Sequence, residues 1–257
     1  MALGPKVRML ATTPPELVVY DEPSECSYLQ GETWRLPLRL PVRQLTHNEF
    51  GRRLDDGDRR QGRLLYRTAC PSCVACEPIR LETDRFELSR GQRRVFKRAN
   101  EQIEVDYGEV EIDEARVHMY NLHKHGRGLA RGELAASLET YRAFLGDSCV
   151  ETFEMRYFVD DELLGIAIVD RAHNALSAVY FYGVPKFSSL SPGVYSILKQ
   201  LELCRTLGLD YLYLGLYIAQ CPAMSYKGRY LPHERLIAGT WRRFDRAASD
   251  DAELYVP

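Results

Sequence analysis

Hydrophobic and polar residues alternate along residues 152–159, in the second half of the chain. Two more strand-like apolar runs follow at residues 163–170 and 176–182, and short polar segments join the three stretches. Alternation is typical of a half-buried β-strand, because successive side chains point to opposite faces of a sheet. Short polar connections favour antiparallel neighbours. The pattern therefore predicts an antiparallel meander.

A helix and one more strand follow the meander. The helix has apolar residues along one face: Val194, Ile197, Leu198, Leu201 and Cys204. Gly208 is a suitable end for this helix, and the run YLYLGL at 211–216 is typical of a strand. Meander, helix and strand, in this order, are typical of the α+β acyltransferase core of the GNAT type. We predict such a core for residues 149–257.

The first half of the chain has weaker periodicity. Residues 1–85 are rich in proline and arginine, and Ser89 is a good N-cap for a helix that continues to residue 100. We expect Val95, Phe96 and Ala99 of this helix to face inward. Two more helices are predicted, one after Asp113 and one along the stripe Leu134, Leu138, Tyr141 and Leu145. We predict that residues 1–148 form a cysteine-containing N-terminal subdomain.

The end of the last strand and the start of the last helix form a candidate ligand site. Residues 191–193 lie at the start of that helix, and residues 213–227 surround the end of the strand. Proteins of mixed α and β structure bind ligands where strand ends face a helix N-terminus. We therefore expect a functional crevice at this place.

The composition is that of an ordinary globular protein. Of the 257 residues, 45% are hydrophobic and 27% charged, and the net charge of -2 gives no overall sign of nucleic-acid binding. No apolar run approaches the roughly 18 residues that a membrane span requires. The N-terminal residues also lack the apolar centre of a signal peptide. We expect a cytoplasmic protein with no membrane partner.

Seven cysteines is an odd number, and three of them are crowded into CPSCVAC, which in a chain without an export signal favours thiols or metal ligands over structural disulfides. Cys70, Cys73 and Cys76 are spaced so that their thiolates can converge on one metal ion or iron–sulfur cluster. Tetrahedral closure needs a fourth ligand, for which Cys26 is the natural candidate. The alternative interpretation is a group of buried thiols at a turn.

The helix after Ser89 has a strongly basic surface. Its cationic residues are Arg90, Arg93, Arg94, Lys97 and Arg98. Such a face can bind nucleic-acid phosphates, which supply affinity without sequence readout. A solvated helix face is the plainer interpretation.

Other groups that carry chemistry are more ambiguous. Glu154 and Asp170 lie on or at the end of the predicted meander strands, where either could take a proton from an amine. Carboxylates at such positions more often form salt bridges. His118, His123 and His125 match no metal-ligand spacing, so we expect exposed imidazoles at a helix end.

The turn that binds coenzyme A in GNAT proteins is absent. That turn carries Q/R-x-x-G-x-G/A, whereas this chain has SLSPG at 189–193 with a single glycine. If this is an acyl-transfer core, another molecule supplies the acyl group. A coenzyme A-dependent N-acetyltransferase and a non-enzymatic RNA-binding protein remain as alternatives.

Several segments together resemble one family. They are ECSYLQGETW, YRTACPSCVACEPIR, SRGQRRVFKRAN, LSAVYFY, SLSPGVYSILKQ and YLYLGLYIAQCPAMSYKGRYLPHE, in this order. They resemble the bacterial aminoacyl-tRNA–protein transferases, the aspartate/glutamate leucyltransferases, which are related to arginyl-tRNA–protein transferases. The resemblance implies transfer of a leucyl or arginyl group from aminoacyl-tRNA to the N-terminal Asp or Glu of a protein, which then becomes a degradation signal. It implies no cofactor for transfer, and it makes tRNA the partner of the basic helix.

The resemblance also implies the residues of the site. Those implied in catalysis are Asp170, Tyr217 and Tyr226. Those implied in substrate binding are Tyr180, Tyr182, Ser189, Leu190, Gly193, Tyr195, Tyr213, Gly215, Met224 and Lys227. Lys227 is expected to meet an acidic acceptor or a phosphate, and amide groups near Gly193 are expected to stabilise an oxyanion.

The chain departs from the family pattern around this crevice. The family usually has Tyr-Asp-Pro where this chain has Tyr182 to Pro185 without the Asp, and Arg-Ser-Leu-Gly where this chain has residues 189–193. It usually has Gly-Tyr-Tyr or Gly-Tyr-Trp where this chain has Gly215-Leu216-Tyr217. A small molecule or a specialised peptide is therefore an alternative acceptor.

Overall fold

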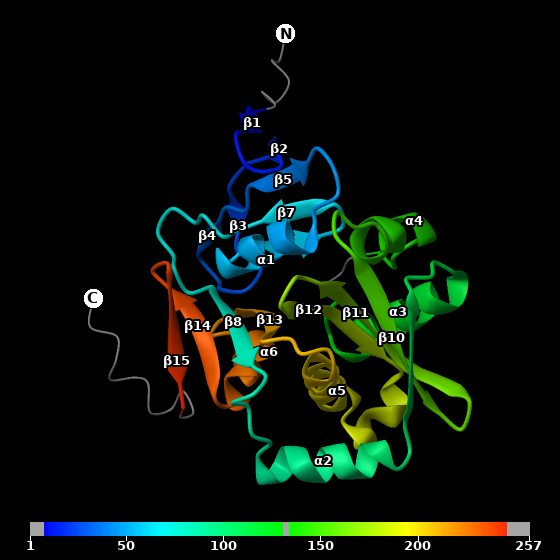
Figure 1. The fold of residues 1–257 in the computed structure, drawn as a ribbon. Coiled ribbons are helices and arrows are strands. Elements are labelled where there is room, and N and C mark those ends of the chain that lie inside the picture. The colour runs from blue at the N-terminus through cyan, green and yellow to red at the C-terminus, as the bar shows by residue number, and fades with distance from the viewer. Residues whose placement is uncertain (1–7, 131–133, 246–257) are drawn as a thin grey trace.

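The computed structural model describes residues 8–130 and 134–245, and its centre is a sheet of eight strands (Figure 1). In order across the sheet they are β15 (Thr240–Phe244), β14 (His233–Ile237), β8 (Glu77–Glu82), β13 (Tyr211–Tyr217), β12 (Ala175–Gly183), β11 (Glu162–Arg171), β10 (Thr152–Val159) and β9 (Glu104–Glu109). Neighbouring strands pair antiparallel except β12 and β13, which are parallel. The predicted α+β class is confirmed.

The predicted order of meander, helix and strand is also confirmed. β10, β11 and β12 form the antiparallel meander, α5 (Pro192–Thr206) follows, and β13 returns parallel to β12. The apolar face of α5 is buried, and the helix ends just before Gly208, which has a positive φ of 64°. Glycine adopts this left-handed conformation without steric cost, so it ends the helix cleanly.

Helices cover both faces of the sheet. α5 lies on one face with α2 (Arg90–Asn100) outside it, and α3 (Glu114–Gly126) lies on the other (Figure 1). β11 shows how one strand supplies both layers. Its Ala167 and Val169 belong to the apolar cluster with α5, while Ile166 and Ile168 belong to the cluster with α3. All four are fully buried, because alternate side chains of a covered strand meet a helix on each face.

The sequence predicted the start of α2 correctly and the start of the helix at Leu134 incorrectly. Ser89 caps α2 in a reciprocal capping box with Gln92, and Ala99 is buried as expected. The predicted helix from Leu134 is wrong at its start: Leu134 is 94% exposed, and α4 covers only Leu138–Tyr141 before a π-helical turn, η1, at Arg142–Gly146. Ser137 caps α4, so the helix cannot begin earlier.

The first part of the chain forms two smaller sheets. A five-stranded sheet contains β1 (Arg8–Leu10), β2 (Glu16–Tyr20), β5 (Leu38–Pro41), β7 (Leu64–Tyr66) and β6 (Arg59–Gln61). A two-stranded sheet contains β3 (Ser24–Glu25) and β4 (Thr33–Trp34). The other short elements are α1 (His47–Asp55), η2 (Pro185–Leu190), α6 (Pro222–Ser225) and η3 (Tyr226–Arg229).

Hydrogen bonds cross the predicted boundary at residue 148. β8 and β9 come from the first half of the chain, yet β8 pairs with β13 and β9 pairs with β10 in the central sheet. The division into residues 1–148 and 149–257 as separate domains stays a prediction. In the described part of the chain, none of the helices combines the length and apolar character needed to cross a bilayer; cytoplasmic location stays a prediction.

Candidate functional site

The parallel strand pair at the middle of the sheet is short. β12 and β13 pair only from Ala175–Tyr211 to Ser177–Tyr213, although both strands continue beyond that point. Past the pairing, β13 carries an irregularity between Tyr213 and Leu216, where Gly215 has a φ of 84°. Strands that stop pairing leave their carboxyl ends open to a ligand. This is where the sequence predicted the crevice.

The start of α5 offers one backbone donor to this region. Ser191, in the left-handed conformation with φ 55°, precedes Pro192, which has no N–H. Among the described residues the N–H of Gly193 has no acceptor, whereas the N–H of Val194 donates to the carbonyl of Ser191 at 3.0 Å. Helix N-termini leave such amides unpaired, and the helix dipole makes them favourable for negative charge. The geometry is consistent with the oxyanion role expected near Gly193.

Around that donor, the predicted Ser189 and Leu190 have structural contacts. The carbonyl of Ser189, in the short helix η2 just before α5, accepts a hydrogen bond of 2.6 Å from the guanidinium of Arg98 on α2. This bond connects η2 to α2. Leu190 is buried in the core. The backbone of Ser189 and the side chain of Leu190 therefore support the start of α5, and a direct substrate contact by Leu190 is not supported.

Three of the predicted tyrosines use their hydroxyl groups inside the protein. The hydroxyls of Tyr182 and Tyr141 lie 2.5 Å apart, Tyr195 donates to Asn100 at 2.6 Å, and Tyr213 donates to Asp55 at 2.5 Å. All three rings are buried. Tyr182, Tyr195 and Tyr213 were predicted to bind substrate, but their hydroxyls are buried and already have partners within the protein.

The remaining predicted aromatic residues differ in their access to solvent. Tyr217 is buried, with the guanidinium of Arg235 4.8 Å from its ring centre, and Tyr180 packs against Tyr120. Tyr226, on η3, is 40% exposed. Tyr226 is thus the predicted tyrosine that is best placed to touch a substrate directly.

Lys227 lies next to Tyr226 but is buried. Its Nζ donates to the carbonyl of Leu216 at 2.7 Å and lies 3.3 Å from the sulfur of Met224. Burial, and then the nearby guanidinium of Arg59, lowers the pKa of Lys227 to about 7. A Cβ at Gly215 would lie 3.7 Å from Nζ, so the irregular end of β13 and η3 surround this amine.

Asp170 is a structural residue, which corrects the prediction that it serves as a base. It is fully buried, and its two oxygens accept hydrogen bonds of 2.7 and 2.8 Å from the guanidinium of Arg60. The hydroxyl of Thr152 donates to it at 2.7 Å. Glu154 is likewise buried and paired with Arg116 at 2.5 Å. Both carboxylates are buried, and the hydrogen bonds that they accept come from groups of the protein itself.

The histidines show a mixed outcome. His118 and His125 are exposed, as expected. His123 is half-buried instead, with its Nδ1 3.2 Å from the N–H and 3.3 Å from the carbonyl of Gly183. Burial lowers the pKa of His123.

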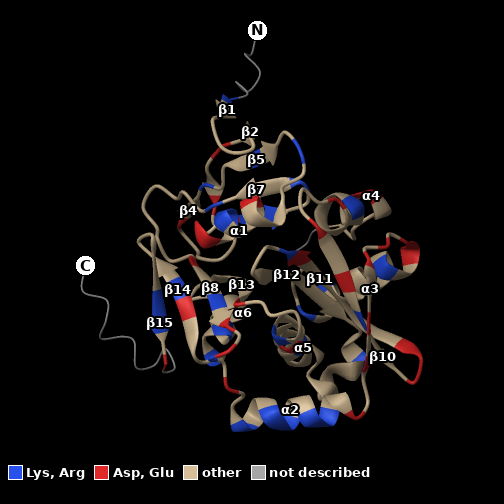
Figure 2. Ribbon diagram, viewed as in Figure 1, with Lys and Arg blue, Asp and Glu red and all other residues tan. Residues whose placement is uncertain are grey.

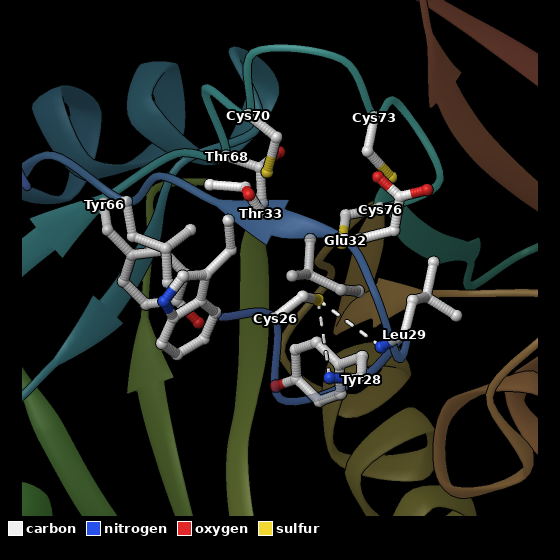
Figure 3. A pocket seen from close by; sticks show the side chains of 13 residues that line it. Cys26, Tyr28, Leu29, Glu32, Thr33, Tyr66, Thr68, Cys70, Cys73 and Cys76 are labelled. Atoms are coloured by element: carbon white, nitrogen blue, oxygen red, sulfur yellow. Dashed lines mark hydrogen bonds between the residues drawn. The ribbon is translucent and has the colours of Figure 1, made fainter. Parts of the chain in front are cut away.

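Four cysteines from distant segments line one cavity. Cys26, Cys70, Cys73 and Cys76 surround a space of about 30 Å³ beside Tyr66 and Leu216 (Figure 3). The N–H groups of Tyr28 and Leu29 both approach the sulfur of Cys26 at 3.4 Å. These contacts orient the sulfur of Cys26.

Without a metal ion, the thiol of Cys76 in this cavity is held in its neutral form. Burial and the neighbouring thiols, Cys70 first among them, raise the pKa of Cys76 to about 12. A bound metal ion reverses this effect, because it stabilises thiolates. Within residues 8–130 and 134–245, however, no three His, Cys, Asp or Glu side chains already stand in a metal-binding arrangement. The donors fit a metal, and binding would require the side chains to close further.

The basic face of α2 is open. Arg90, Arg93, Arg94, Lys97 and Arg98 are all exposed. Figure 2 shows this helix as a cationic strip along one side of the molecule, outside α5. An exposed, continuous cationic strip is the electrostatic feature that attracts nucleic-acid phosphates.

One residue of this region was missed in the sequence. Arg59 stands in the charged segment RRLDDGDRRQG, which resembles a solvated loop, but it lies on β6 and is 5% exposed. Its guanidinium donates to the carbonyl of Gly215 at 2.9 Å. No local signal separates the buried Asp58, Arg59 and Arg60 from the exposed charged residues earlier in the same segment.

The meander, α5 and the parallel strand pair have the order that the sequence predicted for an α+β acyltransferase core. The models of two parts of one family match the chain: "Arginine-tRNA-protein transferase, N terminus" over residues 24–94, and "Arginine-tRNA-protein transferase, C terminus" over residues 115–237. The chain belongs to the arginine-tRNA-protein transferase family. The resemblance stated from its motifs is confirmed, and the protein is an aminoacyltransferase.

Individual relatives agree with this assignment. The aspartate/glutamate leucyltransferase of Chromobacterium violaceum is 34% identical over 220 residues, which cover 86% of this chain and 90% of the relative. That of Aeromonas hydrophila is 34% identical over 223 residues, 86% of this chain and 92% of the relative. Among solved structures, FemX has a TM-score of 0.43 at 10% identity, covering 65% of this chain and 59% of that chain.

Proposed function

We propose that this protein transfers a leucyl group from aminoacyl-tRNA to the α-amine of an N-terminal Asp or Glu of an acceptor protein. The observation that carries the proposal is the 34% identity to aspartate/glutamate leucyltransferases along 86% of the chain. The name of the family keeps arginyl as the alternative donor group. The product would be a protein marked for degradation.

The bonds that form and break in this reaction belong to the two substrates, so the protein needs to do little covalent chemistry itself. The amine nitrogen attacks the ester carbonyl of the aminoacyl-tRNA, the bond between the carbonyl carbon and the ribose oxygen breaks, and the ribose hydroxyl leaves with the proton given up by the amine. The ester is already activated, so alignment and oxyanion stabilisation supply most of the rate. The unpaired N–H of Gly193 supports the second role, and the exposed ring of Tyr226 supports the first.

We assign tRNA binding to α2. Its five exposed cationic residues form the strip described above, and the strip lies beside the helix whose N-terminus faces the proposed crevice. Contacts with the sugar–phosphate backbone would position the acceptor arm without reading its sequence.

We also propose that Cys26, Cys70, Cys73 and Cys76 bind a zinc ion or an iron–sulfur cluster. The shared cavity and the two N–H contacts to Cys26 support this. When bound, the metal would fix the segments 26–34 and 70–76 against each other; transfer itself would need no cofactor.

The test is transfer of radiolabelled amino acids from a mixed pool of charged tRNA to peptides that begin with Asp, Glu, Lys or Ala. We expect labelled leucine on the Asp and Glu peptides alone. Binding of tRNA without labelled peptide would point to a different acceptor, such as a small molecule. Acetylation by acetyl-coenzyme A, or absence of tRNA binding, would overturn the proposal.

A further inference from the structure

The central sheet opens to solvent at β12. Its neighbour β11 is buried without a break from Leu164 to Asp170, as expected for a strand that is covered on both faces. β12 is buried at residues 175–177 and 182–183, but the four consecutive residues 178–181 are only half-buried. Consecutive side chains point to opposite faces, so solvent reaches both sides of β12 at this place. The change begins where pairing with β13 stops, just after Ser177.

The backbone of β12 presents polar groups along this open edge. The N–H of Val184 donates to the carbonyl of Leu164 at 2.8 Å, so the backbone groups of Val184 face β11. In an antiparallel ladder, alternate residues turn their N–H and C=O groups to opposite edges, so those of Gly183 and Phe181 point away from β11. In the described part of the chain, Phe181 has no hydrogen bond to a turn, a loop or a side chain. Both of its backbone groups are therefore available to a ligand.

His123 of α3 lies at the far end of the open edge. Its ring centre is 6.4 Å from the ring centres of both Tyr180 and Phe181, which belong to the apolar clusters on opposite faces of the sheet. A ring that contacts both side chains must lie at the edge of the strand. Its Nδ1 lies 3.2 Å from the nitrogen and 3.3 Å from the oxygen of Gly183, which agrees with the outward direction of these two groups. His123 thus occupies the edge at Gly183 and leaves Phe181 as the open position.

The open edge is next to the expected oxyanion donor. A Cβ at Gly193 would lie 3.8 Å from Cδ1 of Phe181, so the start of α5 packs against the ring of Phe181. Gly193 carries the amide that has no acceptor among the described residues. A peptide that pairs with the backbone of Phe181 would therefore lie beside the place where we expect the ester carbonyl of the aminoacyl-tRNA.

We propose that the N-terminal segment of the acceptor binds in an extended conformation along the open edge of β12, as an added strand. The inference rests on the proposed function and deepens it, because it assigns how the backbone of the acceptor is held. The N–H and C=O groups of one acceptor residue would pair with those of Phe181, since an extended peptide presents the same donors and acceptors as a neighbouring strand. Backbone pairing does not depend on side chains, so it admits many sequences after the first residue.

The first test uses the wild-type protein and acceptor peptides that begin with Asp and continue with alanine. N-methylalanine replaces alanine at position 2, 3 or 4, one position at a time, which removes one N–H and adds bulk on that side of the peptide. Alternate N–H groups of an extended strand point to the same edge. We therefore expect kcat/KM to fall about tenfold or more at every second position and to change by less than about twofold at the position between.

The second test removes the donor on the protein side. Phe181→Pro deletes the N–H of residue 181, and proline is tolerated in a strand where that N–H points away from the ladder. Phe181→Ala is the matched control, because it removes the same ring but keeps the N–H. We expect Phe181→Pro to lower kcat/KM for the unmodified peptide about tenfold relative to Phe181→Ala, with the KM for aminoacyl-tRNA unchanged. Urea denaturation shows whether both variants fold; if Phe181→Pro does not, the peptide series decides.

The contrary outcomes are distinct. Equal effects at all three peptide positions, or no effect at any, would overturn the inference, because an added strand requires alternation. A raised KM for aminoacyl-tRNA in Phe181→Pro, with the KM for the peptide unchanged, would assign the open edge to the donor and would also overturn it. If the wild-type protein does not label the unmodified Asp peptide, the proposed function itself fails.

Discussion

Replacing Asp170 tests whether this carboxylate has a structural or a catalytic role. Asp170→Asn removes the negative charge that faces Arg60, whose side chain is 1% exposed. Both charge-assisted hydrogen bonds between the two residues, at 2.7 and 2.8 Å, change character. The amide can offer only one oxygen, so its NH2 group faces a guanidinium N–H. The guanidinium is left as a buried charge without a counter-ion.

The expected cost is large on the scale of protein stability. Breaking a buried ion pair by removing one partner costs about 3–5 kcal/mol, because the other charge stays buried and uncompensated. Total stability of a domain is about 5–15 kcal/mol. The loss would be smaller in Asp170→Leu combined with Arg60→Met than the sum of the single changes, since the double variant leaves no charge behind.

The assay has two readouts. Urea denaturation gives the free energy of unfolding, and single-turnover transfer at low temperature gives the rate per folded molecule. We expect Asp170→Asn to lose about 3–5 kcal/mol of stability while the rate per folded molecule changes by less than about threefold. Asp161→Asn, in the exposed turn between β10 and β11, is the matched control and should change neither quantity.

A specific result would refute this reasoning. Loss of a general base lowers a rate by about 10²- to 10⁴-fold. A rate reduction of that size in a variant that unfolds at the same urea concentration as the wild type would assign Asp170 to catalysis, and the interpretation of its ion pair as structural would be wrong.

Three more predictions follow from the surface and the buried groups. Arg94→Glu with Lys97→Glu on α2 should weaken tRNA binding by at least about tenfold at 0.1 M salt and flatten its salt dependence, whereas Arg52→Glu on α1 should not; unchanged affinity would contradict the assignment of α2. Cys73→Ser and Cys76→Ser should each reduce the zinc or iron content measured by elemental analysis of anaerobically purified protein, whereas Cys204→Ala, in the core, should not; wild-type protein without either metal would refute the site. The pKa of Lys227 is about 7 in the folded protein and 10.5 in the unfolded chain, so the unfolded state binds more protons between these values and stability due to this group rises with pH from about 7 upward. Because of this group, the free energy of unfolding measured by urea denaturation should rise between pH 7 and pH 9 by up to about 1.4 kcal/mol per pH unit in the wild type, and Lys227→Met should remove that rise. Parallel pH profiles of variant and wild type would show that the buried amine does not titrate in this range.

Some of this architecture was predictable because the signals are local. Alternation at residues 152–159 and two apolar runs joined by short polar segments predicted the three meander strands, the apolar stripe and Gly208 predicted α5, and Ser89 predicted the start of α2. Each depends on the backbone geometry of a few consecutive residues. The exposure of the basic residues on α2 was predictable for the same reason. Val95, Phe96 and Ala99 pack against the core, so the opposite, basic face of the helix points to solvent.

The functional residues depended on contacts between distant segments. Asp170 became structural because Arg60, which is 110 residues away in sequence, reaches it across the interior. Arg59 became a buried residue at the end of β13 because β6 brings it to Gly215, 156 residues later. No periodicity encodes such a pair: the same charged side chain is solvated, paired or left free for a ligand according to what the rest of the chain places beside it. The sequence by itself determined the order of the elements and the family, whereas only the tertiary structure decided which charges are satisfied within the protein and which are not.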